Sequence, residues 1–232
     1  MARHIAIVDS LKDWQFHLPG LEAMAATDYL RGPAIPTSTR IVNLCRSYRY
    51  ASTGYYCSLL AEARGSRVLP SVRTITDLAS RSIYSLNAED LDERVDRRLR
   101  RRREAGDLLA FEILVAFGQC EAADLAPIAQ EIFDAFPCPL LRVEFRHQER
   151  WRIGAIRPLH FGALTAQQRE MVERSLAAYL GRTPRRRRAR PVARYDLAIL
   201  HNPDETLPPS NRGALRKVVA AGKRVGIEVD LI

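Results

Sequence analysis

A short polar and aromatic segment near the end of an apolar run carries the side chains best suited to chemistry in this sequence. The candidate anion-binding residues are Arg46, Ser47, Tyr48, Arg49 and Ser52. Guanidinium groups form charge-assisted hydrogen bonds with carboxylates and phosphates, and hydroxyl groups add neutral donors. The segment therefore predicts a site for a carboxylate or a phosphate. In the alternative interpretation the tyrosines pack in the core and the arginines pair with nearby acids.

The residues around this segment predict a strand, a helix and a second strand. An apolar run over residues 41–45 precedes Arg46, and a second run at residues 68–69 ends at Pro70. Between them, five residues recur at helical spacing and are expected to face the core: Tyr55, Tyr56, Leu59, Leu60 and Ala63. Gly65 suits the end of that helix. Such a unit favours a parallel strand pair, whose ligands bind beyond the carboxyl ends of the strands.

The whole pattern predicts an α/β protein in three parts. Residues 1–181 are expected to form an α+β domain with a mixed sheet. Residues 182–194, with prolines and four consecutive arginines, are expected to form a basic linker. Residues 195–232 then predict a strand, a helix and a strand, in which Ser210 caps the helix and Gly222 ends it.

Other segments of the first part also have clear signals. Residues 23–30 suggest a helical turn, and Asn87 is expected to cap a helix that buries Leu91, Val95 and Leu99. Alternation over residues 109–117 predicts a strand. Residues 140–145 and 151–156 predict an antiparallel hairpin. Thr165 and Gln168 form a capping-box pattern ahead of another helix.

The basic charge of the chain raises the question of nucleic acid. The 232 residues carry a formal net charge of +9, and much of the excess lies in residues 97–103 and 185–190. Arginine-rich helices bind phosphates, so a nucleic-acid-associated protein is one alternative. The first run, however, ends an amphipathic helix, and the second lies in the linker. Because no aromatic residues alternate with these arginines, we expect a solvated helix face and an extended linker instead.

Cysteine and histidine residues give no sign of a metal or a disulfide framework. Cys45, Cys57, Cys120 and Cys138 lack paired spacing, which predicts reduced, mostly buried thiols and a cytoplasmic protein. Arg46 adjoins Cys45, but no histidine nearby in sequence could act as its base, so a cysteine nucleophile is not expected. No apolar run is long enough to cross a membrane, and the N-terminal run is too short for a secretory signal.

Several long motifs carry a resemblance to a known family. They read IVD-x-LKDW-x-FHLPG, then NLCRSYRY followed by SLLAEARG, and later FEILVAFG and FPCPLLRVEF. Together they resemble the N-terminal domain of RimK-like ATP-grasp proteins, and YDLAILHNPDETLPPSN looks like the start of their pre-ATP-grasp domain. Members are thought to be ATP-dependent ligases that join a carboxylate to an amine on peptides or proteins.

The resemblance also implies what this chain is expected to do. The ATP-grasp module should follow Ile232, so ATP and magnesium are expected only with that module, and this chain alone is expected to be inactive. Its expected partners are that module and a peptide, amino-acid or protein substrate with a carboxylate. In the pre-ATP-grasp loop, Asn202, Asp204 and Ser210 are candidate ligand contacts or plain turn residues. A stand-alone binding module for an anionic metabolite or peptide is an alternative, and a homo-oligomer is compatible with both.

Overall fold

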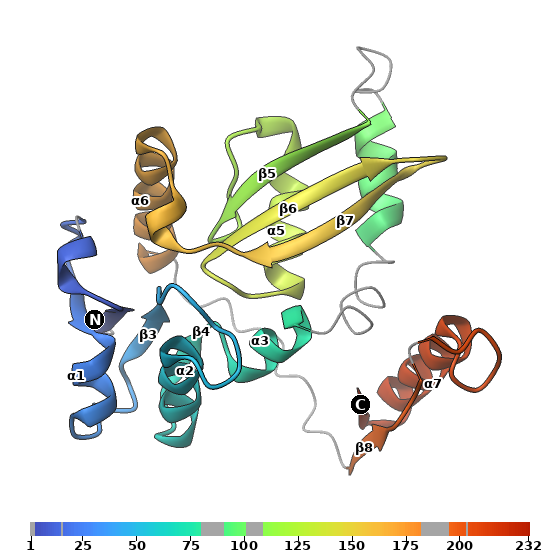
Figure 1. Cartoon of the computed structure of the whole chain (residues 1–232), viewed down its shortest axis with the longest axis horizontal. Coiled ribbons are helices and arrows are strands. Elements are labelled where there is room, and N and C mark those ends of the chain that lie inside the picture. The colour runs from blue at the N-terminus through green and yellow to red at the C-terminus, as the bar shows by residue number, and fades with distance from the viewer. Residues whose placement is uncertain (1–2, 15, 80–90, 101–108, 182–194, 203) are drawn as a thin grey trace.

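The structure belongs to the α/β class, as predicted, and its described residues form two parallel sheets and one antiparallel sheet. The computed structural model describes residues 3–14, 16–79, 91–100, 109–181, 195–202 and 204–232 (Figure 1). The predicted linker at 182–194 and the expected cap Asn87 lie outside these residues. Parallel and antiparallel strand pairs are both present, but they lie in separate sheets, whereas one mixed sheet was predicted.

Residues 4–69 contain the strands of a parallel sheet in the order β2-β1-β3-β4. Its strands are β1 (His4–Val8), β2 (Leu21–Ala25), β3 (Arg40–Asn43) and β4 (Arg67–Leu69). All five residues of β1 are buried, as expected for an interior strand. β2 corrects the helical turn expected over residues 23–30, because helix α1 spans only Ala26–Arg31. The helix-favouring residues of β2 are held extended by parallel pairing along the whole of β1.

Helix α2 (Thr53–Ala63) links β3 to β4, but the face that it buries was predicted wrongly. Its buried residues are Gly54, Cys57, Ser58 and Ala61. Of the five residues expected to face the core, Tyr56 and Leu59 are 46% and 40% exposed, Ala63 is exposed, and Tyr55 and Leu60 are half-buried. Small side chains let the helix approach the sheet closely, so in this helix size selects the buried face and hydrophobicity does not.

The second sheet is antiparallel, in the order β5-β6-β7. Its strands are β5 (Ala110–Ala116), β6 (Leu140–His147) and β7 (Trp151–Pro158), which confirms the predicted strand and hairpin. In Figure 1 the sheet lies in front of α5 (Ala126–Ala135) and a helix over residues 91–100. The predicted residues Leu91, Val95 and Leu99 are buried in this core.

The helix over residues 91–100 also covers part of the edge of β7. Asp96 accepts a hydrogen bond from the backbone N–H of Trp151 at 3.0 Å, and Asp92 accepts one from Ile153 at 2.8 Å. An edge strand whose N–H groups are satisfied in this way offers fewer sites for pairing with another chain. The hairpin is therefore held firmly at the end where its turn lies.

The two sheets meet through a shared apolar core that includes α6 (Ala166–Gly181). Val42, Phe117, Leu140 and Val172 lie in it and come from β3, the end of β5, β6 and α6. The capping box of α6 is confirmed, since Gln168 and Thr165 exchange two side-chain to backbone bonds at 3.0 and 3.2 Å. The other described elements before residue 182 are α3 (Val72–Ala79) and the short helices Leu11–Asp13, Ala123–Leu125 and Phe161–Ala163.

The C-terminal residues form the predicted strand, helix and parallel strand, with two corrections at the helix ends. The elements are β8 (Tyr195–Ile199), α7 (Arg212–Val225) and β9 (Ile227–Leu231). Asn211 caps α7 in place of Ser210, because its side chain accepts the N–H of Ala214 at 2.8 Å.

The end of α7 also lies later than predicted. Gly226, with φ of 77°, adopts the left-handed conformation that ends the helix. Gly222 lies within α7, where a Cβ would come 2.4 Å from Val229, so this glycine serves close packing. Among the described helices of the whole chain, none combines the length and the apolar composition needed to cross a bilayer.

Candidate functional site

The predicted site lies at the carboxyl end of β3, beside the end of β1. The chain leaves β1 toward β2 on one side and leaves β3 toward β4 on the other, so the strand order reverses here. Open α/β sheets bind ligands at such a reversal. Asp9, just after β1, accepts the backbone N–H of Arg46 at 2.5 Å and ties the two strand ends together. The predicted location of the turn is therefore confirmed, while ligand binding there is untested.

Three of the five predicted site residues serve the structure of the turn. Tyr48 is 8% exposed, and its hydroxyl donates to the carbonyl oxygen of Asn43 at 2.6 Å. Ser52 caps α2 by accepting the N–H of Tyr55 at 3.3 Å, and its hydroxyl donates to the Ser47 carbonyl at 2.8 Å. Ser47 in turn accepts the N–H of Arg49 at 3.3 Å. The hydroxyl groups of Tyr48 and Ser52 thus donate within the turn, whereas that of Ser47 accepts a bond there.

The two arginines of the turn are different, because both are exposed. Within the described residues Arg49 has no ion-pair partner. Tyr50 beside it is 85% exposed, and its ring lies 5.3 Å from that of Tyr55. Of the five predicted anion-binding side chains, only the two arginines are thus exposed, and they lie above a turn closed by its own hydrogen bonds.

A buried amide behind the turn holds it in place, and the sequence analysis missed it. Asn43 is fully buried, and its Nδ2 donates to the Gly54 carbonyl at 2.7 Å and to Ser58 at 2.9 Å. Its Oδ1 accepts the N–H of Cys45 at 3.2 Å, and Ser58 donates onward to the carbonyl of Pro70. One side chain therefore joins β3, α2 and the turn after β4.

The start of α2 approaches the turn so closely that only glycine fits. A Cβ on Gly54 would lie 2.3 Å from the Ser47 carbonyl oxygen and 2.7 Å from the Cβ of Cys45. A real Cβ cannot approach a backbone oxygen so closely without a shift of the backbone. Gly54 thus sets the distance between the turn and the helix.

The thiol next to the candidate site is not poised for chemistry. A hydrogen bond with Cys57, followed by burial, raises the pKa of the Cys45 thiol far above its usual value. A protonated and buried thiol is a poor nucleophile, so the expectation of an inert Cys45 agrees with its surroundings. All four cysteines are free; Cys120 is half-buried and the other three are buried.

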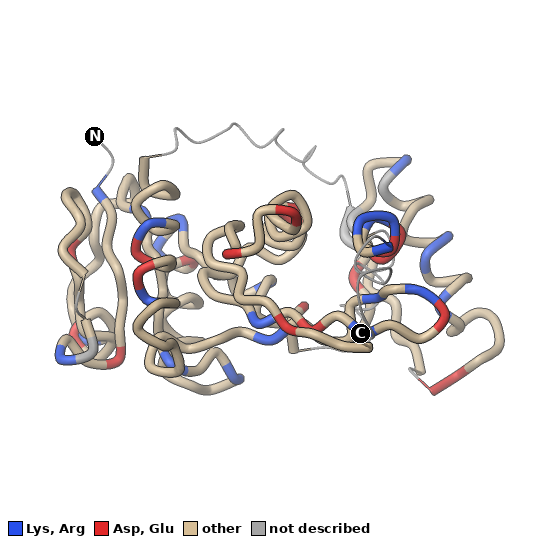
Figure 2. Tube along the Cα trace, turned by 90° about the horizontal axis from the view of Figure 1, so that it is seen from above, with Lys and Arg blue, Asp and Glu red and all other residues tan. Residues whose placement is uncertain are grey.

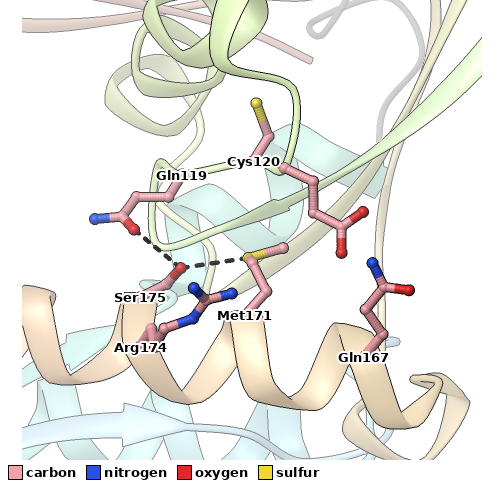
Figure 3. Close-up of a pocket in the computed structure, with 7 residues that line it drawn as sticks. Gln119, Cys120, Gln167, Met171, Arg174 and Ser175 are labelled. Carbon is pink, nitrogen blue, oxygen red and sulfur yellow. Dashed lines mark hydrogen bonds between the residues drawn. The ribbon is translucent and has the colours of Figure 1, made fainter.

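A cleft that the sequence analysis did not foresee lies between α6 and the turn after β5. It has a volume of about 420 Å³, and Figure 3 shows its lining residues, which are Gln119, Cys120, Glu121, Gln167, Met171, Arg174 and Ser175. The buried Ser175 donates to Oε1 of Gln119 at 3.2 Å and so orients that amide. This pair is 56 residues apart in sequence, and no local pattern announces it.

The turn that carries Gln119 has an unusual backbone. Phe117 and Gly118 have φ values of 49° and 82°. A bulky residue in this region is rare and strained. Burial of the Phe117 ring, whose centroid lies 5.2 Å from that of the tilted Tyr179 ring, holds the residue there. Ser175 of α6 orients Gln119 in the cleft, and Tyr179 of the same helix packs on the Phe117 ring that anchors the turn. The cleft and the turn therefore belong to one packed unit.

The loop candidates of the C-terminal unit form ordinary turns. The side chain of Asn202 accepts the N–H of Asp204 at 3.1 Å, and its backbone carbonyl accepts the N–H of Glu205. Ser210 precedes the cap of α7. These bonds account for Asn202 as a turn residue, and a ligand role for Asn202, Asp204 and Ser210 stays a prediction. Nor do the described residues anywhere bring three His, Cys, Asp or Glu side chains together as metal ligands.

Comparison with known proteins gives one clear result. Residues 26–175 match the model of the RimK-like ATPgrasp N-terminal domain, which covers more than half of the chain and includes β3, the turn, α2, β4, the antiparallel sheet and most of α6. No curated protein matches the sequence. The length of the family match, together with the motifs that lie in it, shows that the chain belongs to the family of RimK-like ATPgrasp N-terminal domains.

Proposed function

We propose that this chain is the substrate- or partner-handling portion of a RimK-like ATP-grasp ligase that joins a carboxylate to an amine. The family match over residues 26–175 is the observation that carries the proposal. In such a ligase the ATP-grasp module supplies ATP and magnesium chemistry, and residues 195–232 form the start of the pre-ATP-grasp domain. The chain described here contributes recognition and no catalytic residue.

The turn after β3 supports recognition of a carboxylate. Arg46 and Arg49 are exposed at the place where an open α/β sheet binds ligands. A guanidinium group can bind a carboxylate through two parallel hydrogen bonds. The peptide, amino-acid or protein substrate would therefore place an acidic group here. Asp9 lies close by and repels anions, so two arginines are needed to make the site attractive.

The cleft beside α6 supports a second candidate function, a stand-alone module that binds an anionic metabolite or peptide. Arg174 from α6 and Glu121 from the facing turn line its walls. A cleft of about 420 Å³ falls in the range of small-molecule sites. If the ligand binds in this cleft, Arg174 binds its anionic group in place of Arg46 and Arg49.

One set of variants tests both candidates. Affinity for glutamate-containing peptides should fall about a hundredfold in the Arg46→Ala/Arg49→Ala double variant, because each charge-assisted hydrogen bond contributes roughly 1.5–3 kcal/mol. The Arg174→Ala variant is the matched control and should bind as the parent does. Calorimetric titration measures affinity, and thermal melts show that both variants fold. Unchanged binding in the double variant contradicts the first proposal, and a loss in Arg174→Ala selects the second.

A further inference from the structure

A second group of arginines gathers at the tip of the β6–β7 hairpin, away from the turn after β3. Arg146, Arg150 and Arg152 line one small hollow of about 140 Å³, which Gln148, Ile153 and Gly154 complete. This volume is well below that of a drug-sized pocket. The hollow has room for a small ionic group but none for a whole nucleotide or peptide.

The strand register brings two of these arginines face to face. Arg146 of β6 lies directly opposite Arg152 of β7, and both are exposed on the sheet face that turns away from the core residues Phe145 and Ile153. Side chains at such positions have Cβ atoms roughly 4.5–5.5 Å apart, and like charges placed there destabilise the sheet. Packing does not require two arginines at exposed positions. An anion bound between them would offset their repulsion and so account for the pair.

Nearby acids neutralise only part of this charge. Glu144 accepts a hydrogen bond from Nε of Arg146 at 2.5 Å. Asp96 and Asp92 lie at the edge of β7, where they accept the backbone N–H groups of Trp151 and Ile153. Asp96 is also paired with Arg100 at 2.9 Å and interacts electrostatically with Arg150. Within the part of the chain that the structure describes, Arg152 has no acidic partner. The residues that line the hollow include three arginines and no acidic side chain, so its lining is positive.

Gly154 gives the hollow its shape. A Cβ on this residue would lie 2.9 Å from Cγ, 3.0 Å from Cδ and 3.1 Å from Nε of Arg146. The arginine thus lies across bare backbone, beside the register irregularity between Glu144 and Phe145. Glycine inside a strand costs stability and often marks a place where another group approaches closely. Here it leaves room for the stem of Arg146 to cross the strand, while Glu144 accepts a hydrogen bond from its Nε.

We propose that this hollow binds a phosphate group. Several guanidinium groups around one small space can donate to the oxygens of a dianionic, tetrahedral group, a geometry that arginine matches well. The group can belong to a phosphorylated small molecule or to a nucleic-acid backbone. Figure 2 shows blue and red segments intermixed along the described trace. This mixed charge favours an isolated phosphate over a long polyanion.

Titration of the whole chain with inorganic phosphate tests the proposal. We expect saturable binding in the millimolar range, seen as shifts of the arginine Nε–H signals in NMR spectra. Arg152→Ala should weaken binding about tenfold, the effect of losing one charge-assisted hydrogen bond. Arg157→Ala is the matched control, because Arg157 is exposed on the same strand but does not line the hollow. Melting curves verify that both variants fold.

Each outcome decides for or against the site. An absence of saturable phosphate binding, or an equal loss in Arg152→Ala and Arg157→Ala, overturns the proposal. Selective loss in Arg152→Ala supports it, and acetate in place of phosphate should then bind much more weakly. A single-stranded oligonucleotide added to the phosphate complex identifies the source. Competition for the same arginine signals, together with a steep salt dependence, indicates a nucleic-acid backbone, whereas the absence of competition indicates a phosphorylated small molecule.

Discussion

Two turns of this protein carry arginines, and they are built in opposite ways. In the turn after β3, the polar side chains Tyr48 and Ser52 bond to the turn itself, and the arginines extend above a closed structure. At the β6–β7 tip, strand register sets Arg146 against Arg152 around a hollow. Hydrogen bonds thus fix the conformation of the first turn, and its arginines do not contribute to that conformation. The second derives its shape from the charged side chains.

The two glycines at these turns show the same contrast. A Cβ on Gly54 would meet the Ser47 carbonyl and the Cβ of Cys45, which cannot move without the backbone. A Cβ on Gly154 would meet only the side chain of Arg146, which is long and flexible. The same added methyl group therefore distorts a backbone in one turn and displaces a side chain in the other.

Alanine substitution of these glycines should give the largest effect of our predictions. Gly54→Ala should lower the free energy of unfolding by about 3 kcal/mol, since overpacking against a fixed backbone is costly. Gly154→Ala should change stability by less than about 1 kcal/mol, because alanine suits a strand better than glycine and offsets the shift of Arg146. Urea denaturation measures both. Equal losses would show that the hairpin tip is as rigid as the turn after β3.

This contrast also explains how far the sequence could predict the protein. The order β3, α2, β4 follows from apolar runs and from Gly65, so the position of the turn was predicted correctly. The bonding of the turn depends on Asn43, which lies inside an apolar run and reaches Gly54 and Ser58 on the next helix. No spacing rule connects a buried amide to partners 11 and 15 residues away.

The β6–β7 hairpin also shows how far the sequence could predict the structure. Its two strands were predicted from two apolar segments on either side of a polar turn, and the structure confirms them. Alternation also implies which residues share a face, but only the register decides that Arg146 faces Arg152. This pair lies between the turn and the register shift at Glu144 and Phe145, so it depends on which residues form the turn, and alternation does not determine that. The hollow therefore became visible only in the structure.

Alkaline pH should destabilise the turn after β3 through Tyr48, by less than the Gly54→Ala substitution does. Burial, with smaller contributions from Cys138, Cys45 and Asp9, raises the pKa of Tyr48 well above its usual value near 10. The unfolded chain releases this proton near pH 10 and the folded chain retains it, so stability is complete below pH 10 and is lost as the pH rises above it. The loss should approach about 1.4 kcal/mol per pH unit for this group.

The Tyr48→Phe variant isolates this contribution. It should be less stable at pH 8, because the bond from Tyr48 to the Asn43 carbonyl is lost, yet its stability should fall less steeply than that of the parent above pH 10. Burial also raises the pKa of Cys138 to about 12, and that group weakens both proteins between about pH 9 and 12. Urea midpoints measured across this range, in reducing buffer, give the two slopes. Parallel slopes would mean that Tyr48 ionises freely in the folded protein.

The smallest predicted effect distinguishes the frame of the first turn from its charge. Ser52→Ala should cost about 1 kcal/mol of stability, because α2 loses the side chain that accepts the N–H of Tyr55. Arg49→Ala should change stability by less than about 0.5 kcal/mol, since this side chain is exposed and the turn does not depend on it. Thermal and urea denaturation of the two single variants provide the comparison. A larger loss in Arg49→Ala than in Ser52→Ala would assign the arginine to the fold, and the recognition proposed for this turn would then lose its main support.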